Sequence, residues 1–324
     1  MGVAHEDCIR RVPRDMRNAL AKFGHEAEEI VDGFLTTLEA VPPPPILYHY
    51  TNDVGLRGIL ESGKLWLTDI LSLNDPSELS HGLSHASAIL RGRAANGPPE
   101  SKQFAADFEE MIRLRKVQKS GNYFICSFSS TGDDLGQWRA YADNGRGYAL
   151  GFDADALEEA FIREAGAPIQ KAFPVAYSDA GLIEIHRNII DKMFALISLP
   201  HHRDLGDDAI NAYVAELYTL ITVHALHAGL HFKHGAYANE QEYRFMQVYP
   251  ASNQPTVKLR TRSYSSIPYR EFDWKNAGRN VLKKIVIGPA ADVERASAFA
   301  KESLLLADQQ AVAMACSAIP YRAT

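Results

Sequence analysis

Two glutamates separated by one residue, Glu240 and Glu242, are suited by type and spacing to acid–base or electrostatic catalysis. The residues from Tyr243 onward are typical of a strand, and in an extended segment side chains at i and i+2 point to the same face. We therefore expect both carboxylates on one side of a strand start. Like charges held close raise the pKa of one group, so the two carboxylates can take different catalytic roles. The alternative is an ion pair between Glu242 and Arg244 or a nearby lysine.

A second polar group lies at the end of the first predicted strand, where His49, Tyr50 and Thr51 follow one another. Apolar residues at helical spacing come next, and Gly63 then ends the helix, because glycine readily takes the left-handed conformation found at helix C-termini. Histidine and threonine at a strand end are well placed to hydrogen-bond a ligand laid across a sheet edge. The alternative is a buried histidine that only caps the strand.

Two further pairs of side chains could complete a ligand site. Ser127 and Ser129 flank Phe128 in a predicted strand and therefore share one face. Trp138 and Tyr141, at positions i and i+3 of the predicted helix that follows, form an aromatic pair able to stack on a flat ring. The alternatives are ordinary edge-strand serines and aromatic residues that belong to the core.

Four histidines at helical spacing form a competing cluster: His224, His227, His231 and His234. They share one helix face if the helix extends that far, and such pairs can chelate zinc. The metalloprotease pattern His-Glu-x-x-His is absent, however, and no cysteine lies near. Histidines on an amphipathic stripe are more often packed or solvated groups. We therefore predict no metal site, and a histidine-metal hydrolase is the least favoured function.

Composition limits the class of protein. The chain has 324 residues, 46% of them hydrophobic, which suffices for one large domain or somewhat more. No apolar run approaches the roughly 18 residues of a membrane span, and the N-terminus lacks a signal-peptide pattern. Three widely spaced cysteines favour a reducing cytoplasm over a disulfide framework. The net charge of −6 and the lack of a basic block exclude the usual footprint of a general nucleic-acid binder, but not a local basic groove.

The chain divides into an N-terminal helical extension, residues 1–41, and a main domain, residues 46–324, separated by the proline run 42–45. The extension is expected to be a packing arm or an oligomer or partner contact. The main domain alternates strands and helices, with a long helical insertion at about 180–235 and a β-rich stretch after Glu242. Strand runs split by helical insertions predict an α+β fold and not a doubly wound parallel sheet.

Five sequence blocks carry a resemblance to known families. The chain resembles a bacterial group, the domain of unknown function 2971 family, and more distantly the ADP-ribosyltransferase superfamily. The blocks span about residues 46–290 and are the His49-Tyr50-Thr51 unit with its helix; Leu73 to Glu78; Cys126 to Ser129 with Trp138 and Tyr141; Phe232 to His234 with Glu240 to Arg244; and Ile285 to Pro289. The resemblance implies a split mixed β-sheet core and NAD as a substrate.

The resemblance also implies roles for the two glutamates and the first strand. Glu242 would bind the ribose hydroxyl and stabilise an oxocarbenium-like transition state, while Glu240 would position or deprotonate the acceptor. His49 would contact the NAD ribose, with support from Thr51. Tyr50 stands where these enzymes often have a glycine, which lets the nicotinamide amide approach the backbone.

The remaining implied contacts are with the nicotinamide, the ribose and the diphosphate. Ser127 and Ser129 would brace the catalytic glutamate and touch the ribose, and Trp138 and Tyr141 would wall the nicotinamide. The arginines nearest the motifs, none preferred for the diphosphate, are Arg57, Arg139, Arg146 and Arg244.

The function predicted from the sequence is NAD-dependent mono-ADP-ribosyl transfer to a protein or nucleic-acid acceptor, in a toxin or phage-defence effector. The alternative from another class is a catalytically silent module that binds NAD, ADP-ribose or a partner and keeps the same fold.

Overall fold

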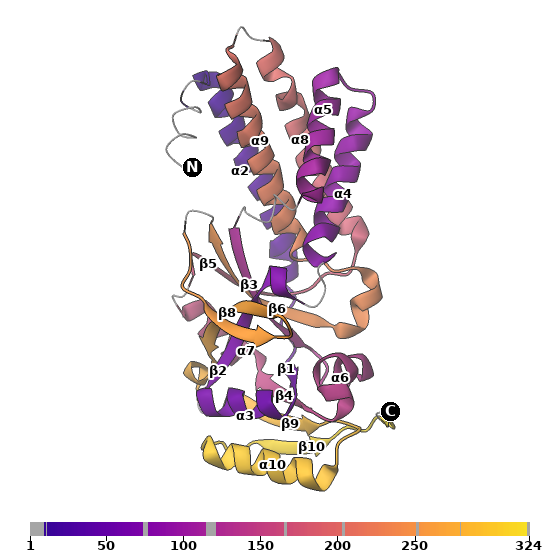
Figure 1. Cartoon of the computed structure of the whole chain (residues 1–324), viewed down its shortest axis with the longest axis vertical. Helices are drawn as coiled ribbons and strands as arrows, with labels where there is room; N and C mark the ends of the chain where they lie inside the picture. Colours follow the sequence, from indigo (N-terminus) through magenta and orange to yellow (C-terminus); the bar gives the residue numbers. More distant parts are fainter. Residues whose placement is uncertain are drawn as a thin grey trace. The chain divides into compact units, whose positions relative to one another are not determined.

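A computed structural model of the chain describes residues 10, 12–73, 77–114, 121–164, 167–202, 205–250, 253–278 and 280–322. The chain forms two compact units, each assembled from three separate segments (Figure 1). The helical unit comprises residues 1–40, 74–120 and 176–235, and the sheet unit comprises 41–73, 121–175 and 236–324. The expected N-terminal extension and the expected insertion at about 180–235 thus lie in one and the same unit.

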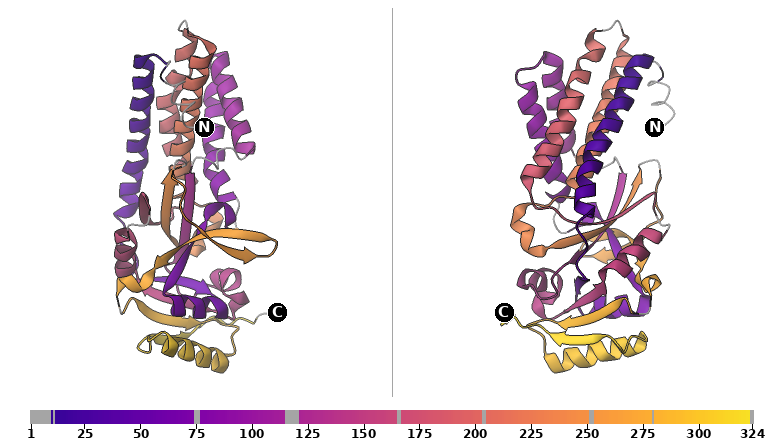
Figure 2. Two further views of the ribbon diagram at one scale, coloured as in Figure 1. Left: turned by 60° about the vertical axis from the view of Figure 1, so that its left-hand side comes forward. Right: turned by 180° about the vertical axis from the view of Figure 1, so that it is seen from behind.

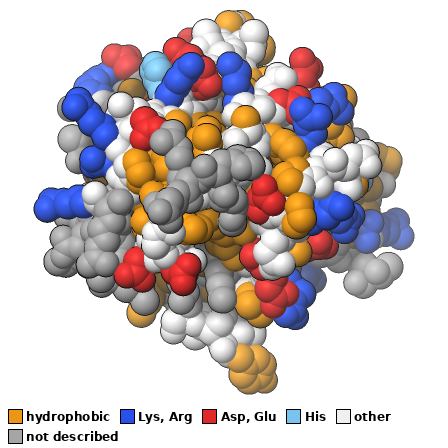
Figure 3. Space-filling view, turned by 90° about the horizontal axis from the view of Figure 1, so that it is seen from above, with side chains coloured by type: hydrophobic (Ala, Val, Ile, Leu, Met, Phe, Trp, Pro, Cys, Tyr) orange, Lys and Arg blue, Asp and Glu red, His pale blue; other side chains and the backbone are white. Residues whose placement is uncertain are grey.

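The helical unit contains five long helices among the described residues: α2 (Arg14–Glu39), α4 (Ser77–Ala94), α5 (Pro99–Arg113), α8 (Asp179–Ile197) and α9 (Asp207–Gly229), with the short η4 (Leu199–His202) between the last two. Helices α8 and α9 contact each other, and both contact α2 and α4. The side chains of Met16, Leu20 and Phe23, spaced three or four residues apart on α2, are buried. Figure 3 shows hydrophobic side chains in the middle of one end view and charged side chains around the rim.

Helix α9 is long and apolar enough, by length and composition, to cross a membrane. Half of that apolar stretch is buried inside the protein, as in the core helix of a helical bundle. The described residues therefore contain no clear membrane span.

The sheet unit is built on one mixed sheet of ten described strands: β1 (Ile46–Thr51), β2 (Lys64–Asp69), β3 (Gly121–Ser129), β4 (Tyr148–Asp153), β5 (Ile169–Pro174), β6 (Glu242–Pro250), β7 (Lys258–Arg262), β8 (Ser265–Asp273), β9 (Leu282–Ile287) and β10 (Ala313–Cys316). The main order is β10-β9-β4-β1-β3-β2-β8-β7, and β6 pairs with both β3 and β5. The β9–β10 pair is parallel, and the other pairs are antiparallel. Figure 2 shows the sheet from two further sides.

The sheet divides beside strand β3. One edge of β3 pairs with β6 along its whole length. On the other edge, β2 pairs with Phe124 and Ile125, and β1 pairs with Ser129. Between these points, 126–128 have no strand partner on that edge among the described residues. We call this gap, where β1 and β2 separate opposite 126–128, the fork.

Four helices of the sheet unit cover or flank the sheet: α3 (Asp53–Ser62), α6 (Leu135–Tyr141), α7 (Ala154–Arg163) and α10 (Val293–Leu306). Short helical turns complete the described structure: η1 (Ile70–Ser72), η3 (Asp143–Gly145), η5 (Gly235–Glu240) and η6 (Trp274–Ala277). The core is aromatic, with Phe128, Phe152, Phe161, Phe245 and Phe272 buried against one another in a set of ring contacts. Burial of these large rings stabilises the sheet unit.

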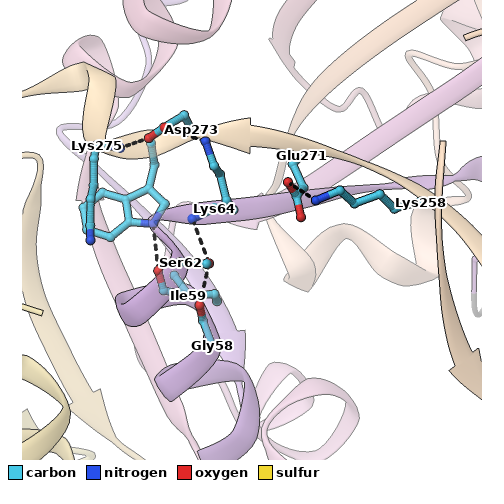
Figure 4. Close-up of polar contacts among 9 residues, drawn as sticks. Gly58, Ile59, Ser62, Lys64, Lys258, Glu271, Asp273 and Lys275 are labelled. Atoms are coloured by element: carbon cyan, nitrogen blue, oxygen red, sulfur yellow. Dashed lines mark hydrogen bonds and ion pairs between the residues drawn. The ribbon is translucent and has the colours of Figure 1, made fainter. Parts of the chain in front are cut away.

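The connection from α3 to β2 ends as its sequence predicts. Gly63 has φ 69°, in the left-handed region, and its N–H is donated to the carbonyl of Ile59. The indole N–H of Trp274 is donated to the same carbonyl at 3.2 Å. Lys64 and Asp273 form an ion pair across β2 and β8 (Figure 4). The end of α3 is therefore held by Trp274 of η6, beside the ion pair that joins β2 to β8.

The α+β class predicted from the sequence is confirmed. Helices α8 and α9 lie within the expected insertion at about 180–235, and strands β6 to β9 make up the β-rich stretch from Glu242 onward. Asn74, Asp75 and Pro76, a combination typical of a helix start, lie outside the described residues.

Candidate functional site

Ser127 lies on β3 opposite the fork and connects the histidine of β1 to the glutamate of β6. The Nδ1 atom of His49 lies 3.2 Å from the Ser127 carbonyl oxygen. A carbonyl oxygen only accepts, so this contact requires the tautomer that carries its hydrogen on Nδ1. Burial lowers the pKa of His49, and the nearby charge of Arg260 lowers it further, while the contact with Ser127 acts in the opposite direction. Burial thus disfavours the charged imidazolium, and one ring nitrogen is committed to the sheet.

The side chain of Ser127 makes the second link. Its hydroxyl is donated to Oε1 of Glu242 at 2.7 Å. The same oxygen accepts from Nε of Arg244 at 2.7 Å, and Oε2 accepts from Nη2 of that arginine at 3.1 Å. Only 6% of Glu242 and 1% of Arg244 is exposed. The expected brace by serine and the alternative ion pair with Arg244 therefore occur together.

Ser129 shares a face with Ser127 and holds the backbone before the glutamate. Its hydroxyl is donated to the carbonyl oxygen of Glu240 at 2.7 Å. The N–H of Ser130 is donated to the carbonyl of Gln241 at 3.0 Å. The serine segment thus fixes both the side chain of Glu242 and the main chain that leads into it.

The expectation that Glu240 and Glu242 share one face of an extended segment is wrong. Glu240 is the last residue of η5, and Gln241 has φ 44°, in the left-handed region, so the chain turns between the two glutamates. A carboxylate oxygen of Glu240 lies 3.5 Å from the hydroxyl of Tyr141, near the surface. One carboxylate is therefore buried beside Arg244 and the other lies near the rim beside Tyr141.

Tyr50 and Trp138 stabilise the connection between β3 and α6. The Tyr50 hydroxyl is donated to the carbonyl of Thr131 at 2.9 Å and accepts from the N–H of Asp134 at 3.1 Å. Burial raises the pKa of Tyr50. Trp138 packs edge-on against Tyr50, donates its indole N–H to Asp133 at 2.7 Å and is fully buried. Trp138 presents no ring face for a nicotinamide, because its whole side chain is enclosed by the protein.

Thr51 and Tyr141 differ in how far their side chains are exposed to solvent. Thr51 is half-buried, and its hydroxyl lies so close to Gly55 that a Cβ there would sit 1.8 Å from Oγ1. The first turn of α3 can approach the end of β1 because residue 55 is glycine. Tyr141 is 40% exposed and is therefore the member of the predicted aromatic pair that can meet a ligand.

Arg260 on β7 is a residue near His49 that was not predicted from the sequence. Its guanidinium lies 5.3 Å from the ring centroid of Trp66, and its Nη2 donates a hydrogen bond to Oγ1 of Thr68 at 3.2 Å. Burial lowers the pKa of Arg260, and the neighbouring charge of Arg262 adds to that effect. No described carboxylate lies within ion-pair distance of this arginine. The alternation of cations along β7 was the available signal.

The four arginines named from the sequence are differently placed. Arg57 pairs with Glu302 at 3.2 Å, Arg146 pairs with Asp143 at 3.0 Å, and Arg244 pairs with Glu242. Arg139 is exposed. Three of the four thus already have a carboxylate partner.

The histidine cluster does not form a continuous helical row. Helix α9 ends at Gly229, so His231 and His234 follow its end. Nδ1 of His231 lies 2.8 Å from the carbonyl oxygen of His227, and burial lowers the pKa of His224. Within the described part of the chain, no group of three metal-binding side chains is arranged to hold an ion.

Residues 137–245 match the family model described as "Protein of unknown function (DUF2971)". The matched stretch contains Trp138, Tyr141 and both glutamates, while His49 and the two serines precede it. No match was found among curated proteins or among solved structures. The match supports the resemblance to this family.

Proposed function

We propose that the protein is an NAD-dependent mono-ADP-ribosyltransferase whose reaction centre lies at the fork. The observation that carries this proposal is that Ser127 contacts both His49 and Glu242, which come from strands far apart in the sequence. Groups that act on one reacting centre must be held together in this way. The resemblance of the sequence blocks supplies NAD as the substrate.

In the proposed reaction the bond between the nicotinamide nitrogen and the anomeric ribose carbon breaks, and nicotinamide leaves with the bonding electrons. The ribose becomes an oxocarbenium-like cation. Glu242 stabilises this positive charge, and its orientation is fixed in advance by Ser127 and Arg244, so no reorganisation is needed when the charge develops. The acceptor then forms a bond to the same carbon and loses its proton to Glu240.

The test measures nicotinamide release and label transfer from NAD labelled in its adenylate half, for the wild type and for Glu242→Gln. We expect both activities to fall at least about a hundredfold in Glu242→Gln, the scale seen when one preorganised electrostatic group is lost. Glu294→Gln is the matched control, because Glu294 is an exposed residue of α10 and the chemical change is identical.

Ser127→Ala serves as a second variant if Glu242→Gln does not fold. Ser127 is exposed, so its hydroxyl can be removed without opening a cavity. We expect roughly tenfold slower turnover with little change in the thermal midpoint. A folded wild type that neither releases nicotinamide nor transfers label would refute the proposal, as would full activity in folded Glu242→Gln.

A second candidate function is a catalytically silent module that binds NAD, ADP-ribose or a partner. The ion pair favours it, because Arg244 compensates the charge that catalysis would use. Titration calorimetry with NAD and with ADP-ribose distinguishes the two. Binding without nicotinamide release would support the module, and release lost in Glu242→Gln would support the enzyme.

A further inference from the structure

The hairpin of β7 and β8 carries positive charge in an acidic protein. The chain as a whole has a net charge of −6, yet the hairpin, residues 258–273, carries more cations than carboxylates. Its cations are Lys258, Arg260, Arg262 and Arg270, and its carboxylates are Glu271 and Asp273. In Figure 2 (left panel) the hairpin, drawn in orange, extends away from the other strands of the sheet. Local charge of this kind attracts a polyanion even when the net charge is negative.

Lys258, Arg260 and Arg262 alternate along β7 and therefore share one face, which we call the basic stripe. Cross-strand partners also share a face. Lys258 is opposite Tyr269, Tyr269 is opposite Thr68, and Thr68 is opposite Ile125, two residues before Ser127 on β3. The basic stripe thus lies on the face of the sheet that carries Ser127 and Glu242.

The members of the stripe differ in how far their charge is compensated. Lys258 pairs with Glu271 at 2.8 Å across the hairpin (Figure 4), and this carboxylate raises the pKa of Lys258. Arg260 instead lies over the ring of Trp66 and contacts the Thr68 hydroxyl. Its guanidinium is thus oriented by neutral groups, which leave its charge for an anion such as a phosphate.

Aromatic rings accompany the cations. Trp66 is 42% exposed and lies 4.5 Å from the ring of Tyr269, centroid to centroid. Tyr264, at the hairpin tip, is fully exposed and has φ 60°, a conformation that is uncommon for a bulky residue. Exposed rings beside arginines are the combination that binds unpaired bases by stacking and their phosphates by charge.

We infer that the basic stripe binds single-stranded nucleic acid and delivers it as the acceptor to the site at the fork. The role of the nucleic acid as acceptor depends on the proposed transferase function, whereas its binding to the basic stripe does not. An acidic peptide would satisfy the arginines but leave the exposed rings without partners. A duplex conceals its base faces and would likewise use the charge alone.

Binding is tested first without NAD, so its outcome is independent of the transferase proposal. Fluorescence anisotropy with a labelled single strand of about 15 nucleotides matches the usual length of such sites. We expect affinity to fall with salt, and Arg260→Gln to reduce the slope of log K against log salt by about 0.7, the value for one lost contact. The double variant Arg262→Gln/Tyr264→Ala should weaken binding more than roughly tenfold through lost stacking and charge.

Arg295→Gln is the matched control, because Arg295 is an exposed arginine of α10 outside the hairpin. Its affinity should equal that of the wild type. No binding at about 50 mM salt would overturn the inference. So would equal losses in Arg295→Gln, or equal competition by polyglutamate or by a duplex of the same sequence.

Whether the bound nucleic acid is the acceptor is tested with labelled NAD and the same oligonucleotide. We expect label on the oligonucleotide with the wild type, and its loss in Arg262→Gln/Tyr264→Ala while nicotinamide release continues. If the oligonucleotide binds but remains unlabelled while NAD is consumed, it is not the acceptor, and only the inference that the basic stripe binds single-stranded nucleic acid is retained.

Discussion

Replacing Glu242 by alanine should destabilise the sheet unit strongly. The change removes the acceptor of three hydrogen bonds, one from Ser127 and two from Arg244, and takes the carboxylate away from an arginine that is only 1% exposed. Breaking a buried ion pair on one side costs about 3–5 kcal/mol. For a unit of this size the thermal midpoint should fall by about 6–20 °C.

The loss of stability should depend on which side chain replaces Glu242. Glu242→Gln keeps one carbonyl oxygen that can accept from Ser127 or Arg244, so it should cost less, about 2 kcal/mol. The double variant Glu242→Leu/Arg244→Met removes both charges and should recover most of the stability, because apolar replacements of a buried pair are often neutral. It should not recover nicotinamide release, since the proposed catalytic carboxylate is gone.

Tryptophan fluorescence provides the assay. The three tryptophans, Trp66, Trp138 and Trp274, all belong to the sheet unit, so urea unfolding followed by fluorescence reports on that unit. Circular dichroism at the helix band, which arises mainly from the five long helices of the helical unit, serves as an internal reference. A loss in the free energy of unfolding below about 1 kcal/mol for Glu242→Ala would refute the reasoning that Glu242 and Arg244 form a buried ion pair. Activity that returns with stability in the double variant would show that Glu242 has a structural role only.

Three further predictions concern other residues. Tyr50→Phe should lower the thermal midpoint by a few degrees, because it removes bonds to Thr131 and Asp134 worth about 1 kcal/mol each, while the affinity for NAD measured by calorimetry stays unchanged. Glu240→Gln should abolish label transfer but keep nicotinamide release, since water can still capture the cation; equal loss of both would rule out a separate acceptor role. Burial lowers the pKa of His186 to about 4, so the unfolded chain gains a proton below its ordinary 6.5 while the native imidazole does not. Stability should therefore fall by about 3 kcal/mol between pH 6.5 and 4, and His186→Met should flatten this dependence in urea titrations followed by circular dichroism.

Most elements of the fold could be predicted because their patterns are local. The alternation after Tyr243 predicts β6, and Gly63 predicts the end of α3, which its φ of 69° confirms. The turn at Gln241 could not be predicted in this way, because the left-handed conformation is usually taken by glycine or asparagine. The two glutamates consequently occupy different environments, although their spacing suggested a shared face.

The contacts that make the site depend on strand order, which a single sequence does not reveal. Ser127 and Glu242 meet because β3 pairs with β6 in one particular register. Arg260 reaches Trp66 because β7, β8 and β2 lie side by side in the sheet. The ion pair of Glu242 with Arg244 was one of two sequence interpretations, and it occurs because both side chains are buried on the same face of β6.

The chain passes from one unit to the other five times, so the two units are completed at different times during synthesis. The helical unit is complete once residue 235 has been made, whereas β3 acquires its full-length partner only with β6. At about 5–20 residues per second, β3 would wait roughly 6–23 s for that partner. During this interval a buried, aromatic-rich strand has an open edge, the feature that promotes association between nascent chains. The yield of folded protein should therefore depend on the speed of translation between the codons for β3 and β6.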